Sequence, residues 1–274
     1  MKSPAETPTD TTPESAFPRR SRRIQLQRTM HRLIDPILSV PNAWRARQAL
    51  GTLPAGDYRV PMPIPYVAQF ASPEHIKAYI HDELHGRDDP AWATFGAPDP
   101  DTYTFWAHRA CAIACLKMAV DGFGSAPRES MFALTEAGIQ HGGYITHDAT
   151  GAFVDMGWLY AGLVKLAETR GLTVRGMAYA SVLDVCAAIR DGWGVAAAVT
   201  PEIGEPEGSP YYRVRRYDGH FVLVYGFRWD RGCTHLLLHN PSGRSAEMQA
   251  DAVIPIRRFR AAFAHRFIAF RPSS

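Results

Sequence analysis

The spacing of apolar positions along the chain changes about two thirds of the way through. Up to residue 192, apolar residues recur every three or four positions, and several of these stretches begin at a capping residue or end at a glycine. From residue 194 onward, short β-rich runs are separated by turn residues. The pattern predicts helices over 72–84, 103–122, 128–143, 156–172 and 181–192, and strands over 194–200, 220–229, 234–240, 252–256 and 266–270.

Helices followed by an antiparallel meander predict an α+β fold rather than a doubly wound sheet. The chain of 274 residues is 46% hydrophobic and 11% aromatic, which is enough for one large core. We expect the folded domain over residues 58–274, beginning with an extended, proline-punctuated arm at 58–74.

Residues 1–57 are predicted to form a disordered, basic head with a short helix. The first 18 residues are rich in Pro, Thr, Ser and Glu, a composition typical of disorder. The basic run RRSRR follows, and Pro36 interrupts the helical spacing after it. Such a helix can touch an acidic membrane surface, pack on the domain or present a solvated face. Its apolar positions are Ile24, Leu26, Met30, Leu33 and Ile34.

Charge and composition exclude several classes of partner and location. Residues 1–48 hold nine Lys and Arg against four Asp and Glu, so the remainder of the chain is close to neutral and offers no footprint for nucleic acid. The chain shows no n-region and apolar h-region at its start and no apolar run of membrane-spanning length, so we expect neither a secretory signal nor a transmembrane segment. Four cysteines without a signal predict free thiols and a cytoplasmic location.

No metal ion or organic cofactor is expected. Cys233, His235 and His239 share one strand parity, but they lack a fourth ligand and the spacing typical of zinc sites.

Two of the cysteines, Cys111 and Cys115, are one helical turn apart in the segment RACAIACLKM. Cys111 lies near the start of its helix, where backbone N–H groups and the positive end of the helix dipole favour the reactive thiolate. Cys115 lies one turn deeper among apolar residues, where a cysteine behaves as a small hydrophobe. Cys111 is therefore the candidate nucleophile.

A base and an orienting group are present 109 and 129 residues downstream of Cys111. If 220–229 and 231–240 pair as a hairpin around residue 230, His220 lies opposite Asn240 on the same face. The Asn240 oxygen would accept the imidazole Nδ1–H, leaving Nε2 to take a proton from a thiol. His108, three residues before Cys111, is a candidate oxyanion donor or substrate contact, and equally a solvated histidine.

The segment ACAIACLKMAV, followed by GHFVLVYGF and LLLHNPSG, resembles papain-like cysteine peptidases of the bacteriocin-processing, double-glycine leader peptidase type. In this resemblance Cys111 matches the nucleophile, His220 the base and Asn240 the orienting residue. The resemblance covers about residues 60–270. It implies a papain-like fold, with the helical N-terminal half packed on a C-terminal antiparallel sheet, and hydrolysis of peptide bonds.

Three positions bear on the oxyanion site of that family. The glycine after the nucleophile is Ala112 here, and the glutamine about six residues before it is Phe105. Gln69 resembles the glutamine of the family's leading strand, although 42 residues separate it from Cys111. If Gln69 folds back, it would complete an oxyanion hole with the Cys111 backbone N–H.

These observations leave several functions open. The first is a stand-alone cysteine peptidase or thiol hydrolase acting on a peptide or protein substrate. The same triad supports acyl transfer if an amine replaces water. Ala112 and Phe105 favour instead a papain-like module that binds a peptide with little or no turnover. The last open function is the docking of a partner through the basic head. Tyr211 and Tyr212, just before the base, are candidates for one wall of a substrate cleft, or parts of an ordinary surface loop.

Overall fold

A computed structural model describes residues 22–124, 128–145, 147, 157–209 and 219–273. The α-helices in these ranges are α1 (Arg22–Leu38), α2 (Val40–Leu50), α3 (Ile76–Ile80), α4 (Pro100–Ala107), α5 (Cys111–Phe123), α6 (Met131–Gln140), α7 (Tyr160–Thr169), α8 (Val182–Arg190) and α9 (Ile256–Ala262). The strands are β1 (Gly56–Arg59), β2 (Leu172–Ala178), β3 (Gly194–Val199), β4 (His220–Trp229), β5 (Cys233–His239), β6 (Ala252–Pro255) and β7 (Phe263–Pro272).

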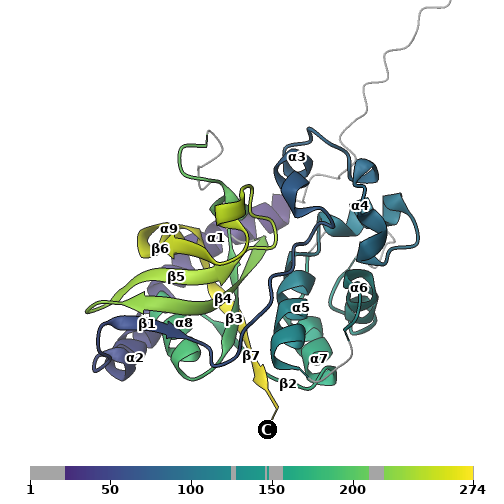
Figure 1. The fold of residues 1–274 in the computed structure, drawn as a ribbon. Helices are drawn as coiled ribbons and strands as arrows, with labels where there is room; N and C mark the ends of the chain where they lie inside the picture. The colour runs from purple at the N-terminus through teal and green to yellow at the C-terminus, as the bar shows by residue number, and fades with distance from the viewer. Residues whose placement is uncertain (1–21, 125–127, 146, 148–156, 210–218, 274) are drawn as a thin grey trace, which may run out of the picture.

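The strands form one antiparallel sheet in the order β2-β7-β3-β4-β5-β6, and β1 pairs with the far end of β4. Figure 1 shows α5, α6 and α7 on one side of this sheet and α2 and α8 on the other. Every residue of β3 is buried, and so is almost all of β4, as expected for strands covered on both faces. The predicted α+β fold is confirmed.

Helix α5 is the central helix of the core. It packs against β3, β4 and β7, and most of its side chains are fully buried, including those of Ile113, Cys115 and Met118. A helix that is apolar on most sides is stable only in such a position. Because α5 packs against β4, the helix that carries the candidate nucleophile lies next to the strand that carries the candidate base.

The head differs from the prediction. Residues 22–50 form two helices rather than one short one, and α1 continues through Pro36. Helix α2 packs on α8, and Leu50 at its end is fully buried. Asp35 of α1 is buried and forms an ion pair of 2.8 Å with Arg266 of β7. Tertiary contacts of this kind, which composition does not reveal, join the second half of the head to the domain.

Other predicted elements differ in their limits. The helix expected over 72–84 is reduced to a 3₁₀ turn at Pro73–His75 and the short α3, because the Ser72 hydroxyl bonds Asp89 instead of capping the helix. The helix expected over 103–122 is two helices, α4 and α5. Strand β2 follows α7 directly and was not predicted. Within the part of the chain that the structure describes, no helix has the length and apolar character needed to cross a membrane.

Candidate functional site

His220 and Asn240 are joined by a buried hydrogen bond at one end of the β4–β5 hairpin. The distance from His220 Nε2 to Asn240 Oδ1 is 2.8 Å. The two residues are 3% and 1% exposed, so the bond is shielded from bulk water. His220 is the first residue of β4 and follows Gly219, whose φ of 108° is accessible mainly to glycine. This glycine lets the chain turn directly into the strand at the histidine.

The register of the hairpin is not the predicted one. Leu223 pairs with His239 and Val224 with Leu238, which displaces the pairing by two residues from the expected alignment of His220 with Asn240. Asn240 follows the end of β5 and reaches His220 diagonally. Because side chains alternate between faces with a period of two, a displacement by two keeps both residues on the same face.

The ring nitrogens of His220 have the reverse of the predicted roles. Asn240 Oδ1 lies against Nε2, not Nδ1. A carboxamide oxygen only accepts, so Nε2 carries the proton in this pair and Nδ1 carries the lone pair of the neutral imidazole. Nδ1 is thus the nitrogen able to accept a proton from a nucleophile.

His220 is held in its neutral form at neutral pH. Burial lowers its pKa to about 4, the positive charge of Arg244 acts in the same direction, and the hydrogen bond to Asn240 opposes them. A neutral imidazole with a fixed tautomer is the form that acts as a general base.

Cys111 is the first residue of α5. Ala110 precedes it at the N-cap position and provides no side-chain hydrogen bond to the helix start. The thiol therefore lies at the positive end of a helix of 13 residues, where the thiolate is favoured. Cys111 is half-buried and Cys115 fully buried. Burial raises the pKa of the Cys115 thiol well above its usual range, so the two cysteines are unequal in the predicted direction.

The break between α4 and α5 is produced by a tertiary contact. The chain turns at 108–110, and the indole Nε1–H of Trp158 donates to the carbonyl of Arg109 at 2.7 Å. The Arg109 guanidinium in turn bonds the Phe105 carbonyl and lies over the Phe105 ring. These contacts place Cys111 at a true helix start, which hydrophobic periodicity alone does not indicate.

Two segments link the start of α5 to the His220–Asn240 pair. On one side, Trp158 bonds Arg109, and Tyr160, two residues on, contacts the ring of Phe221 beside His220 with centroids 5.6 Å apart. The second link runs through residues 69 and 70. Gln69 N–H donates to the carbonyl of Pro241, next to Asn240, at 2.9 Å, and the Phe70 ring packs edge-on against His108 at 5.0 Å.

Gln69 folds back to the site despite its distance in sequence. It is 3% exposed, and among the residues that the structure describes its Oε1 has no hydrogen-bond partner. Ala71, two residues on, donates its backbone N–H to the hydroxyl of Tyr103 on α4 at 3.0 Å, which connects the segment to the Cys111 side as well. A buried carboxamide whose oxygen is not engaged by the protein is available to a ligand.

His108 is half-buried against Phe70, so it is not a fully solvated histidine. Burial, followed by the charge of Arg109, lowers its pKa to about 4. As a neutral imidazole it retains one N–H donor near the start of α5.

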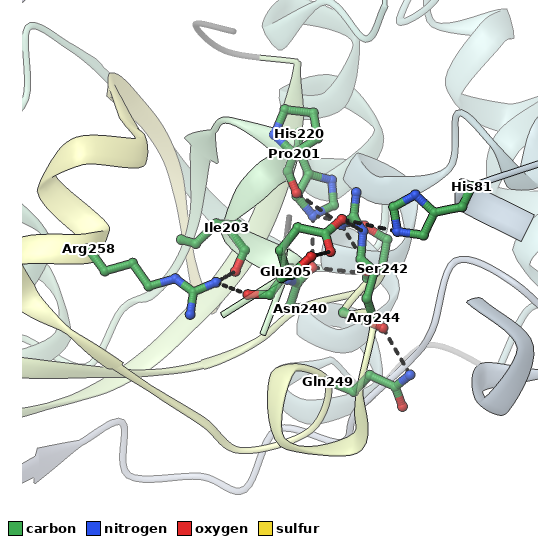
Figure 2. A network of polar contacts seen from close by, with 12 residues as sticks. His81, Pro201, Ile203, Glu205, His220, Asn240, Ser242, Arg244, Gln249 and Arg258 are labelled. Carbon is green, nitrogen blue, oxygen red and sulfur yellow. Dashed lines mark hydrogen bonds and ion pairs between the residues drawn. The ribbon is translucent and has the colours of Figure 1, made fainter. Parts of the chain in front are cut away.

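Three functional neighbours of His220 were missed in the sequence. Ser242 contacts the same Nε2 through its hydroxyl at 3.2 Å, and its N–H donates to Asn240 Oδ1 at 3.1 Å. Arg244 bonds the carbonyls of Ser242 and Pro201 and forms a buried ion pair with Glu205 at 3.2 Å. Figure 2 shows these side chains as one network beside His220.

The network joins two loops beneath the imidazole. Arg258 of α9 donates to the carbonyls of Ile203 and Glu205, and His81 lies 3.4 Å from the Glu205 carboxylate. The loop 201–205 is therefore held against the turn 240–244 from several directions. In the sequence, the only sign of this network is Ser-Gly-Arg directly after Asn-Pro. A charged residue that is buried against a distant partner leaves no periodic pattern.

The remaining candidates lie apart from this pair. Cys233 contacts the carbonyl of His235, and His239 uses both ring nitrogens, on the Ile64 carbonyl and the Asp251 N–H. Within the described ranges no cluster of three or more His, Cys, Asp and Glu side chains is arranged to hold a metal ion. Tyr211 and Tyr212 lie outside the described residues.

Comparisons with known proteins find similarity only among solved structures. No family model and no curated protein matches the chain. It is similar to the peptidase domain of Streptococcus ComA, a bifunctional ABC transporter involved in a quorum-sensing pathway, with 14% identity and a TM-score of 0.37 over 61% of this chain and 93% of that one. A double-glycine motif protease from an AMS/PCAT transporter, in complex with the leader peptide, has 16% identity and a TM-score of 0.35 over 60% and 86% of the two chains. The peptidase domain of Streptococcus mutans ComA has 14% identity and a TM-score of 0.32 over 60% and 93%.

Proposed function

We propose that this protein is a cysteine-peptidase-like thiol hydrolase that cleaves a peptide bond through Cys111, His220 and Asn240. The observation that carries the proposal is the buried hydrogen bond between His220 and Asn240. It lies at the end of the hairpin that residues 69–70 and 158–160 connect to the start of α5. A candidate nucleophile, base and orienting group thus belong to one region of the molecule.

Each residue has a defined step in the proposed reaction. His220 Nδ1 takes the proton from the Cys111 thiol, and the sulfur attacks the carbonyl carbon of the scissile amide. The tetrahedral intermediate then expels the amine, which receives the proton from His220. Water, deprotonated by His220, hydrolyses the resulting thioester and regenerates the thiol. Asn240 keeps Nε2 protonated throughout, so that Nδ1 always faces the reaction.

The developing oxyanion needs donors near the start of α5. The backbone N–H of Cys111 is one candidate, and the carboxamide of Gln69 is the second. The buried position of Gln69 beside Pro241 supports this role, in which the Nε2–H groups of its carboxamide are the donors. His108 is an alternative donor, because burial keeps it neutral. Replacing Gln69 and His108 one at a time by alanine distinguishes the two, since only the oxyanion donor lowers kcat with little change in KM.

Alkylation by iodoacetamide near neutral pH tests the nucleophile. We expect Cys111 to be labelled selectively, because the other three cysteines are buried. His220→Ala should slow this labelling, and His235→Ala, which removes a half-buried histidine at the other end of the hairpin, is the matched control. Equally slow labelling of Cys111 and Cys115 would contradict the assignment of the nucleophile.

Turnover requires a second experiment. Wild-type protein and Cys111→Ala are incubated with a diverse peptide library, and the products are read by mass spectrometry. Cleavage that depends on Cys111 is the expected result, and products joined to an added amine would identify acyl transfer instead. A peptide-binding module without turnover, which Phe105 and Ala112 favour, would show retained peptides and no Cys111-dependent product.

A further inference from the structure

Helices α1 and α2 carry a continuous stripe of exposed apolar side chains. Leu33, Ile37 and Trp44 are 69%, 70% and 62% exposed. We call the whole set the apolar stripe; it consists of Leu26, Met30, Leu33, Ile37, Val40 and Trp44. The first four follow the spacing of one helical face, and the last two continue it into α2.

The opposite, polar face of α1 is the one that packs on the domain. Asp35 is 2% exposed and bonds Arg266 of β7, and His31 bonds the same carboxylate at 3.0 Å. An amphipathic helix on a globular protein normally buries its apolar face and exposes its polar one. Here the order is inverted, since a buried ion pair with β7 attaches the helix while its apolar side chains are exposed.

The charged residues of α1 and α2 are all positive apart from Asp35. Residues 22–50 contain six arginines and a single acidic residue, Asp35, which is buried and paired. Arg32, Arg45 and Arg47 are exposed. An apolar face bordered by arginines, with a tryptophan at its edge, matches the chemistry of the interface of an anionic lipid bilayer.

We propose that the apolar stripe and its bordering arginines bind an anionic membrane surface, with α1 lying in the plane of the interface. A second copy of the chain fits less well, because a self-complementary contact would bring the arginines of both copies together. Lipid headgroups supply the negative charge, and the acyl boundary receives the leucine and isoleucine side chains. The protein would then hold its candidate catalytic site close to a membrane.

Flotation of the full-length protein with vesicles tests this surface. Phosphatidylcholine vesicles are compared with vesicles of phosphatidylcholine and phosphatidylglycerol, at low and at raised ionic strength. We expect binding to the mixed vesicles that weakens as salt rises. Leu33→Glu combined with Ile37→Glu should weaken partitioning by about tenfold or more, because it removes two exposed apolar side chains that the bilayer would bury. On binding the mixed vesicles, the tryptophan emission of the wild-type protein should shift to the blue, and Trp44→Phe should lose this shift.

Matched variants separate this effect from a general loss of apolar surface. Leu84→Glu combined with Val253→Glu changes two exposed apolar residues elsewhere, which are 40% and 38% exposed, and should leave vesicle binding unchanged. Arg45→Ala combined with Arg47→Ala should reduce both the binding and its salt dependence. The side chain of Arg231, 97% exposed and remote in sequence, gives the control Arg231→Ala.

Four results would overturn the proposal. One is the absence of binding to mixed vesicles, and another is binding that both glutamate pairs reduce equally. The third is a dimer in light scattering that Leu33→Glu with Ile37→Glu converts to a monomer, which would make the stripe a contact between copies. Binding to polyglutamate without binding to vesicles would assign it to an acidic protein partner and count against the membrane as well. Cys111 alkylation in the stripe variants should equal the wild-type rate, so failure here is distinct from failure of the proposed hydrolase.

Discussion

Replacing His220 by glutamine should remove a defined part of the protein's sensitivity to acid. In the native state, burial and the charge of Arg244 lower the pKa of His220 to about 4, against the opposing effect of the hydrogen bond that His220 donates to Asn240. In the unfolded chain the pKa returns to about 6.5. Between these values the unfolded state binds more protons than the native state. The contribution of His220 to stability is therefore complete above about pH 6.5 and is lost as the pH falls towards 4.

The size of this contribution follows from the two pKa values. Integrated from about pH 7 to about pH 5, a histidine with this shift lowers the free energy of unfolding by about 2 kcal/mol. No discount for solvent screening applies, because His220 is only 3% exposed. Glutamine has a similar length and does not titrate. Between these two pH values, the free energy of unfolding of His220→Gln should therefore fall by about 2 kcal/mol less than that of the wild type.

Urea unfolding at the two pH values, followed by circular dichroism, measures the difference. The control is Ser242→Ala, which removes the other contact of Nε2 at 3.2 Å but keeps the imidazole. It should lower stability at both pH values and leave the difference between them as in the wild type. An equal loss in His220→Gln and in the wild type would show that burial does not hold His220 neutral.

Two further predictions concern the surroundings of the site. Glu205→Gln should lower the free energy of unfolding, measured in urea, by about 3–5 kcal/mol, because it leaves the buried charge of Arg244 without its carboxylate. The control is Asp57→Asn, which breaks a half-exposed ion pair and should lower that free energy by under about 1 kcal/mol. Trp158→Phe removes the donor to the Arg109 carbonyl; it should lower the free energy of unfolding by about 1–3 kcal/mol and slow the alkylation of Cys111. A loss of stability with an unchanged alkylation rate would show that the indole hydrogen bond does not position the start of α5.

The C-terminal strands could be predicted from sequence more closely than the helices. Strand β4 has the predicted limits, and β3, β5 and β6 differ from theirs by one residue at one or both ends, because glycine, asparagine and proline bound their β-rich runs. Strand β2 was missed for a physical reason. It lies at the sheet edge, contains Gly176 and alternates poorly between buried and exposed residues, so it has no period of two to detect. Its pairing with β7, not its own pattern, makes it a strand.

The break before Cys111 could not be read from periodicity either. The segment from 103 to 122 is apolar enough for one continuous helix, and only Trp158, 49 residues away, withdraws the Arg109 carbonyl from the helical pattern. Gln69 illustrates the same limit. Its position depends on a backbone bond to Pro241 across more than half of the chain. Contacts of such long sequence separation depend on the assembled fold and leave no local signal.

The contact between His220 and Asn240 was predictable for a reason that also explains what was wrong about it. The alternation of a strand depends only on whether a displacement is even or odd, so pairing displaced by two residues still brings both side chains to one face. The displacement does change the approach, because Asn240 lies past the end of β5 and meets the ring diagonally at Nε2. Ser242, two residues further on, reaches the same nitrogen. With Nε2 held by two neighbours of one turn, Nδ1 is the nitrogen available for proton transfer. A substitution that alters the 240–244 turn should therefore change the reactivity of Cys111 even when His220 and Asn240 are intact.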